Sequence, residues 1–275
     1  MQSRCRKYKK LISKTLSVFA LCAVLTVSAF ADTETAEYSI HADSKSNITA
    51  YNDFVLQPAV SKSVSEYEMI KELRQYPTDT LKENGFSQKE ITAIKGPLKA
   101  KSKYGNITYT INYDKMYQKN GETFLRTKMT WDWSKAPICL LTDIPAMTTS
   151  ETFTKDSATA KVQYYAYGNK NKKTSTSSPK VKTANAGQGV YIKLSMGKNF
   201  DVSEHSYKEI PLSGSITTSW SVSKKLKQVG IASNYGHTIL SCTPSVSFGR
   251  SAAIGFTPEK RCKYGDEAYM KATLK

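Results

Sequence analysis

The chain has 275 residues and carries 40 Lys and Arg against 23 Asp and Glu, a formal net charge of +17. Its 5 cysteines are too few for a disulfide scaffold, and its 3 histidines lack the paired spacing of a zinc site. The length permits a substantial hydrophobic core. The basic excess favours an anionic partner.

Residues 1–31 have the order of a secretory signal peptide. Basic side chains come first, an apolar run follows, and the segment ends at Ala29-Phe30-Ala31. The apolar run is shorter than the roughly 20 residues that a transmembrane helix needs. We therefore predict cleavage after Ala31, a secreted, extracellular protein, and no transmembrane span in the mature chain, residues 32–275.

Charge is distributed unevenly along the mature chain. Residues 32–100 hold 8 basic and 11 acidic side chains, a net charge of −3, whereas residues 101–275 hold 26 and 12, a net charge of +14. No nucleic-acid recognition motif is present, and an exported protein meets little nucleic acid. We expect an anionic envelope polymer or membrane surface as the partner. The alternative is that the lysines only solvate strand faces.

The first part of the mature chain predicts a leader followed by helices. Residues 32–62 are polar and predict a flexible leader. Residues 63–100 predict a helical hairpin, in which Ser87 and Glu90 form a capping box. Its single apolar stripe consists of Leu81, Phe86, Ile91 and Ile94. Because so short a hairpin is unstable alone, we expect the stripe to pack against the following domain and cover an edge or an end of it. A docking site for a partner helix is the alternative.

Residues 101–275 predict a basic β domain. Alternating apolar and polar residues flank Asn120-Gly121, a strong local signal for a β-hairpin. Further strand-like runs lie at residues 158–167, 189–196, 210–222, 229–240, 243–248, 252–256 and 268–274. We therefore predict a mainly β fold, an antiparallel β-sandwich or open barrel preceded by a small helical hairpin. Trp131 and Trp133 are expected to fill its core.

One segment combines charge with the absence of any apolar residue. "NKNKKTSTSSPK", residues 169–180, predicts a solvated loop, and the functional alternative is a basic loop that touches an anionic surface. Tyrosines just before it suit stacking on sugar rings or a membrane interface, and core filling is the equal alternative. The candidate surface-binding residues are Lys170, Lys172, Lys173, Tyr164, Tyr165 and Tyr167.

Signatures of catalysis are missing from the sequence. It has no Gly-x-Ser-x-Gly elbow, no Gly-rich phosphate loop and no His-Glu-x-x-His helix. Cys139 and His237 are conceivable as a thiol nucleophile and its base, but the apolar neighbours of Cys139 favour a buried structural thiol. We predict no catalytic residue, cofactor or metal site, and no enzyme. Cys242 and Cys262 are a candidate disulfide, with free thiols as the alternative.

Four stretches carry a resemblance that spans about residues 78 to 256. They are "LKENGFSQKEITAIKG", "YGNITYTINY", "TWDWSKAP" and "SNYGHTILSCTPSVSF". Together they resemble a loose group of secreted proteins of Gram-positive bacteria that pair a short helical hairpin with a Ser/Thr-rich β region. Some members look like large bacteriocins of the geobacillin type. No functional residue is implied by this resemblance.

These observations support one main hypothesis and two alternatives. The main hypothesis is a secreted, non-enzymatic protein that acts at an anionic cell-envelope surface, as an antibacterial bacteriocin-like protein. The first alternative is an extracellular module that binds a glycan or surface without killing. The second is a cell-wall hydrolase.

Overall fold

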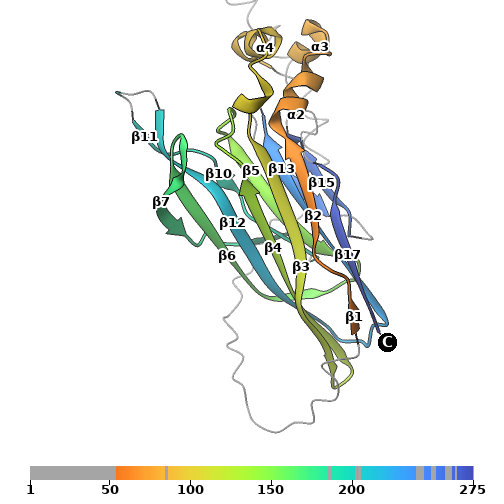
Figure 1. Cartoon of the computed structure of the whole chain (residues 1–275). Coiled ribbons are helices and arrows are strands. Elements are labelled where there is room, and N and C mark those ends of the chain that lie inside the picture. Colours follow the sequence, from red (N-terminus) through yellow and green to blue (C-terminus); the bar gives the residue numbers. More distant parts are fainter. Residues whose placement is uncertain are drawn as a thin grey trace, which may run out of the picture. The chain divides into compact units, whose positions relative to one another are not determined.

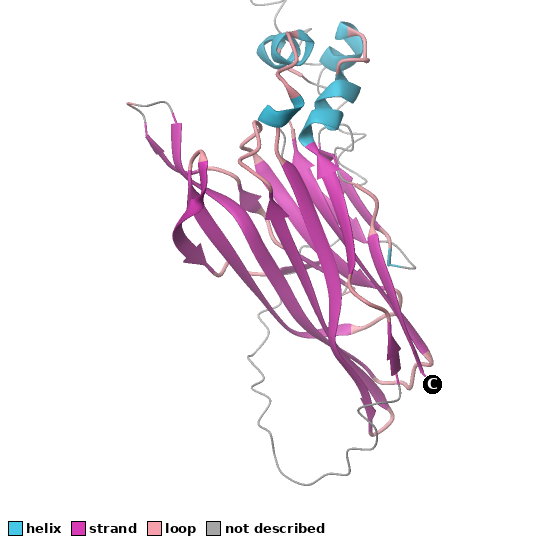
Figure 2. Cartoon of the chain, viewed as in Figure 1, coloured by secondary structure: helices cyan, strands magenta, loops and turns pink. Residues whose placement is uncertain are grey.

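The computed structural model describes residues 54–83, 86–184, 188–201, 203, 206–239, 245–248, 252–257, 262–263 and 265–274. All of them belong to one compact unit. The described chain is mainly strand, with short helices between β2 and β3 (Figure 2). The predicted signal peptide and most of the predicted leader lie outside the described residues.

The first large sheet is antiparallel and contains seven strands of the described chain (Figure 1). Their order is β2 (Val60–Ser65), β3 (Asn106–Lys119), β4 (Glu122–Trp133), β12 (Ser206–Val222), β6 (Thr154–Ala166) and β7 (Asn169–Ser177), with β11 (Lys198–Asp201) beside β12. Side chains alternate between core and solvent along β3 and β4, as the period of a half-buried strand requires.

The second large sheet is also antiparallel and contains eight described strands. Their order is β1 (Phe54–Leu56), β17 (Ala268–Leu274), β13 (Gln228–Thr238), β5 (Thr142–Thr149), β9 (Gly189–Tyr191) and β8 (Lys182–Ala184), with β10 (Leu194–Ser195) beside β5 and β16 (Cys262–Lys263) beside β13. A separate pair consists of β14 (Ser245–Phe248) and β15 (Ile254–Thr257).

The two large sheets pack face to face around one core. Tyr109 on β3 donates its hydroxyl to the carbonyl of Asp266 at 2.6 Å, and Tyr113 donates to the carbonyl of Val229 at 2.8 Å. Trp131 and Trp133 on β4 are also buried in this core, as expected. The fold is therefore mainly β, with antiparallel sheets packed as a sandwich, which confirms the predicted fold class.

The predicted hairpin about Asn120-Gly121 joins β3 to β4. Asn120 has a φ of 51° and Gly121 a φ of 87°. Two successive positive φ angles are the mark of the tight turn that matches the twist of antiparallel strands. The Asn-Gly pair therefore sets the register between two of the longest strands in the described chain.

Three short helices follow β2, as the predicted helical hairpin requires. They are α2 (Glu66–Leu73), α3 (Thr78–Glu83) and α4 (Gln88–Lys95), and the 3-10 turn η1 (Lys101–Lys103) comes next. Ser87 accepts from the amide of Glu90, and the Glu90 carboxylate accepts from the amide of Ser87, so the capping box is present. The helices lie at one end of the strands (Figure 1).

The apolar stripe of the helical segment is buried. Leu81, Phe86, Ile91 and Ile94 are 2%, 5%, 2% and 7% exposed and belong to the same core cluster as residues of both sheets. The ends of α2 and α4 are tied together, because Arg74 donates to the carbonyl of Ile94 at 2.9 Å. The stripe is therefore part of the hydrophobic core of the described unit, as expected.

Two segment boundaries differ from the prediction. Residues 54–56 and 60–62, predicted as leader, form β1 and the first half of β2. Each pairs with a strand far away in the sequence, β1 with β17 and β2 with β3. β1 has only three residues and the apolar positions of β2 are two valines, so neither sequence is a long enough pattern to predict a strand.

Candidate functional site

The predicted basic loop is in fact an edge strand, followed by a segment that connects the two large sheets. Residues 169–177 form β7, which pairs with β6 at the edge of the seven-stranded sheet. The chain then crosses to β8 at the edge of the eight-stranded sheet. The absence of apolar residues is explained by exposure, because nearly every β7 side chain is exposed or half-buried on both faces.

Four exposed lysines lie along this edge and its crossing: Lys172, Lys173, Lys180 and Lys182. We call these four residues the lysine edge. None of them has an ion-pair partner among the residues that the structure describes. Lys170, by contrast, donates to Oδ2 of Asp132 on β4. The predicted group of Lys170, Lys172 and Lys173 is therefore divided, with one member engaged and two exposed.

The three candidate tyrosines have different environments. Tyr165 is 6% exposed and its hydroxyl lies 3.0 Å from that of Ser213, so it is a core residue and the prediction that it contacts a surface is wrong. Tyr164 is half-buried beneath Lys198, whose Nζ lies 4.6 Å from the ring centroid. Tyr167 is 51% exposed, beside Gly168 in the β6–β7 turn. Tyr167 alone of the three presents most of its ring to solvent.

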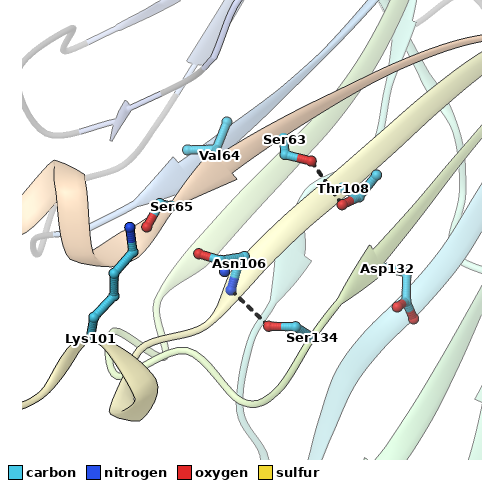
Figure 3. A pocket seen from close by; sticks show the side chains of 8 residues that line it. All are labelled: Ser63, Val64, Ser65, Lys101, Asn106, Thr108, Asp132 and Ser134. Atoms are coloured by element: carbon cyan, nitrogen blue, oxygen red, sulfur yellow. Dashed lines mark hydrogen bonds between the residues drawn. The ribbon is translucent and has the colours of Figure 1, made fainter.

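A shallow pocket of about 450 Å³ opens beside α2 on the exposed side of β2, β3 and β4 (Figure 3). Its lining residues are Ser63, Val64, Ser65, Lys101, Asn106, Thr108, Asp132 and Ser134. We call this the polar pocket. Ser63 and Thr108 share a hydrogen bond of 2.9 Å, and Ser134 accepts from the backbone amide of Asn106 at 3.0 Å. These bonds hold the floor of the polar pocket in place.

A charged cluster that the sequence did not predict lies inside the fold. His237 on β13, Asp143 on β5 and Glu66 at the start of α2 are all 0% exposed. Nδ1 of His237 lies 2.9 Å from Oδ1 of Asp143, and Nε2 lies 3.7 Å from Oε1 of Glu66. The second distance is that of an ion pair and is too long for a hydrogen bond.

Hydrogen bonds hold both carboxylates of this cluster. Oε1 of Glu66 accepts from the amides of Ile138 and Cys139 at 2.7 and 2.9 Å. Asp143 accepts from the hydroxyl of Tyr235 at 2.9 Å. The cluster therefore links the first helix, the segment before β5, and two central strands of the eight-stranded sheet.

The electrostatics of the cluster favour charged side chains. Burial alone would lower the pKa of His237, but the Asp143 and Glu66 carboxylates raise it to about 9. Burial would likewise raise the pKa of Glu66, but His237 and two backbone amides hold that pKa below its usual value. An imidazolium between two carboxylates is thus the stable state at neutral pH.

Cys139 lies beside this cluster and His237 belongs to it, although the two do not form a nucleophile and its base. Cys139 donates its amide to Glu66, and His237 faces the same carboxylate. Burial and the carboxylates of Glu66 and Asp143 raise the pKa of the Cys139 thiol far above its usual value. A thiol held in this protonated form is a poor nucleophile.

Sequence reasoning missed both carboxylates of the cluster. Glu66 resembles an ordinary acidic residue in the first turn of a helix, and Asp143 lies in a strand that was not predicted. Cys242 lies outside the described residues, so the candidate disulfide with Cys262 stays a prediction. In the described part of the chain, no three His, Cys, Asp or Glu side chains are placed to hold a metal ion.

No helix of the described residues is long and apolar enough to cross a membrane. No protein-family model matches the chain, and no curated protein matches it. Among solved structures, the chain is similar to Clostridium perfringens delta-toxin, with a TM-score of 0.25 and 6% identity over 82% of this chain and 95% of the toxin. It is also similar to the KRT10-binding region domain of the pneumococcal protein PsrP, with a TM-score of 0.22 and 8% identity over 66% and 88% of the two chains. At these TM-scores the similarities carry no inference about function.

Proposed function

We propose that the chain is a secreted, non-enzymatic protein that acts at an anionic cell-envelope surface through the lysine edge. The observation that carries this proposal is the placement of four exposed lysines, with no ion-pair partner in the described part of the chain, on the edge strands β7 and β8 and on the segment that connects them. The net charge of +14 in residues 101–275 provides a long-range attraction in the same direction.

The geometry of the lysine edge suits a polyanion or a layer of anionic head groups. An edge strand projects side chains into solvent without disturbing the core, so consecutive residues such as Lys172 and Lys173 are exposed on opposite faces of the edge and accessible to an extended surface. Each basic residue near such a surface contributes on the order of 1 kcal/mol to attachment. Lysines on an edge strand also discourage strand pairing between molecules.

The decisive experiment measures binding of the protein to vesicles that contain anionic lipid and to isolated Gram-positive cell walls. One variant replaces all four lysines of the lysine edge by Ser. The control replaces four other exposed lysines by Ser: Lys103, Lys128, Lys225 and Lys227. The net charge changes equally in both variants, so only position differs.

The lysine-edge variant should fold normally and lose roughly a hundredfold or more in affinity. The control should lose much less, and binding of the parent should fall steeply between low and physiological salt. Equal losses in the two variants would show that charge alone matters and would refute the lysine edge. Salt-independent binding, or none, would refute the whole proposal.

We further propose that attachment leads to killing, as in a bacteriocin-like protein. A glycan- or surface-binding module without killing is the alternative, and a cell-wall hydrolase is the third possibility. Purified protein, residues 32–275, is tested for inhibition zones on Gram-positive strains and for release of soluble wall fragments. Inhibition without fragments supports the proposal, no inhibition supports the binding module, and released fragments support the hydrolase.

A further inference from the structure

The polar pocket contains several polar groups whose hydrogen-bonding capacity is unused. Ser65 Oγ is shielded from solvent and has no hydrogen-bond partner among the described residues. The side chains of Asn106 and Asp132 are exposed, and within the described chain neither the Asn106 side-chain amide nor Oδ1 of Asp132 has a protein partner. These groups come from β2, β3 and β4, three adjacent strands that meet at this pocket.

Ser65 is unusual because it occupies a capping position without capping. It is the N-cap residue of α2, yet its side chain makes no bond to the helix backbone. A serine at this position normally accepts from an amide of the first turn. Ser65 lines the polar pocket, but its hydroxyl is turned away from solvent and unsatisfied, which reduces stability. A rotation of this side chain would bring the hydroxyl to the pocket, where a ligand hydroxyl would supply the missing partner.

The charges at the polar pocket are already balanced by protein partners. Lys101 lies 3.4 Å from Glu68, and Lys170 is bonded to Asp132. Figure 3 shows Lys101 and Asp132 at opposite ends of the lining, with Asn106 between them. The pocket therefore has no surplus charge to attract a phosphate or a carboxylate, and Val64 is its single apolar lining residue.

We propose that the polar pocket binds an uncharged sugar unit of a cell-envelope glycan. Its free groups include both donors and acceptors, and a sugar hydroxyl both donates and accepts. The volume of about 450 Å³ falls within the usual range for small-ligand sites. This site is distinct from the lysine edge, because it recognises hydroxyl groups rather than negative charge.

The test measures binding of chitotetraose, maltotetraose and mannotetraose to the protein by calorimetry and by shifts of assigned amide NMR signals. We expect millimolar or tighter binding of at least one of them, with shifts at Asn106 and at residues 65–68. Asn106→Ala removes a side chain with no partner in the described fold and should weaken binding about five- to tenfold. Asn112→Ala is the matched control, because Asn112 is an exposed residue of the same strand outside the pocket.

A second variant separates binding from folding. Ser65→Ala removes an unsatisfied hydroxyl, so it should leave the unfolding midpoint unchanged or raise it while weakening sugar binding severalfold. Binding should also be nearly independent of salt, unlike attachment through the lysine edge, so the two proposals fail separately. The inference is overturned if none of the three sugars binds, if Asn106→Ala binds as well as Asn112→Ala, or if Ser65→Ala lowers the unfolding midpoint.

Discussion

Nδ1 of His237 lies 2.9 Å from Oδ1 of Asp143, and neither side chain is exposed to solvent. A buried ion pair contributes little net stability compared with a well-packed apolar pair, because both charges lose their hydration. Removing one partner is different, since it leaves the other charge buried and uncompensated. Removing either charge of this pair should therefore lower the free energy of unfolding.

Asp143→Asn should lower the free energy of unfolding by about 3–5 kcal/mol, because it strands His237 beside a neutral amide. Urea denaturation measures this change. Asp114→Asn is the control, since Asp114 lies 3.7 Å from Arg126 in an exposed pair whose loss should cost about 1 kcal/mol or less. Similar losses in the two variants would contradict the importance of burial.

The stability of the fold should depend on pH through His237. Its folded pKa of about 9 exceeds the ordinary value of 6.5, so its contribution is fully present below pH 6.5 and is lost as pH rises through 9. This difference between the unfolded and folded pKa values of His237 corresponds to about 3 kcal/mol in the free energy of unfolding. Glu66 acts in the opposite direction, because its lowered pKa gives stability that is lost as pH falls below its usual pKa of 4.5.

Unfolding free energy measured from pH 4 to pH 10 checks this behaviour. We expect a maximum between pH 5 and pH 7 and a decline toward pH 9. His237→Gln should be less stable at neutral pH and should lose most of the alkaline decline. A variant that keeps the full decline would assign it to other groups, such as tyrosines and lysines.

Most strands that could be predicted from the sequence have one face in the core, although β13, predicted at residues 229–240, is buried along almost its whole length. Alternation marked β3 and β4, and the Asn-Gly pair marked their turn. Strand-like runs also indicated β6, β12 and β17; β17 has the predicted bounds, whereas β6 and β12 begin four residues before the predicted starts. A period of two is visible only when one face is apolar and the other is polar.

β5 could not be predicted because both of its faces are buried and an internal proline argues against a strand. Ile144 and Ala146 pack with Phe248 of β14, while Met147 faces the main core. Such a strand shows no alternation, and Pro145 lies within it although proline cannot donate to a ladder. Asp143 belongs to this strand, so the buried cluster was hidden for the same reason.

β7 illustrates the opposite case, in which neither face is buried. Nothing in its composition separates it from a loop, since its pairing with β6 is made by the backbone and by polar contacts such as Thr176 to Gln163 at 3.1 Å. The sequence could locate the basic segment and its exposure. The division between Lys170 and its neighbours depends on Asp132, which is distant along the chain.

Single substitutions test whether Lys170 and Lys172 contribute differently to attachment. Lys172→Ser should weaken attachment to anionic vesicles by roughly fivefold, because an exposed lysine is free to contact the surface. Lys170→Ser should weaken it by about twofold or less, because Lys170 already interacts with Asp132 and must leave this partner to contact a lipid. Vesicle co-sedimentation at low salt measures both. A larger effect from Lys170→Ser would indicate that the pair opens on binding.

Close packing between β12 and β4, two neighbouring strands of the seven-stranded sheet, gives a final test of the fold. Gly214 on β12 has no room for a side chain, since an added Cβ would lie 2.3 Å from Cζ2 of Trp131 and 2.6 Å from the carbonyl oxygen of Lys161. Its φ is not positive, so the constraint is steric. Gly214→Ala should therefore lower the free energy of unfolding by about 1–3 kcal/mol and alter the near-ultraviolet circular dichroism of the tryptophans.

Ser215→Ala is the control, because Ser215 is the next residue and points to the opposite face of the sheet. If both variants unfold at the same urea concentration as the parent, the packing of Trp131 against β12 described here is wrong.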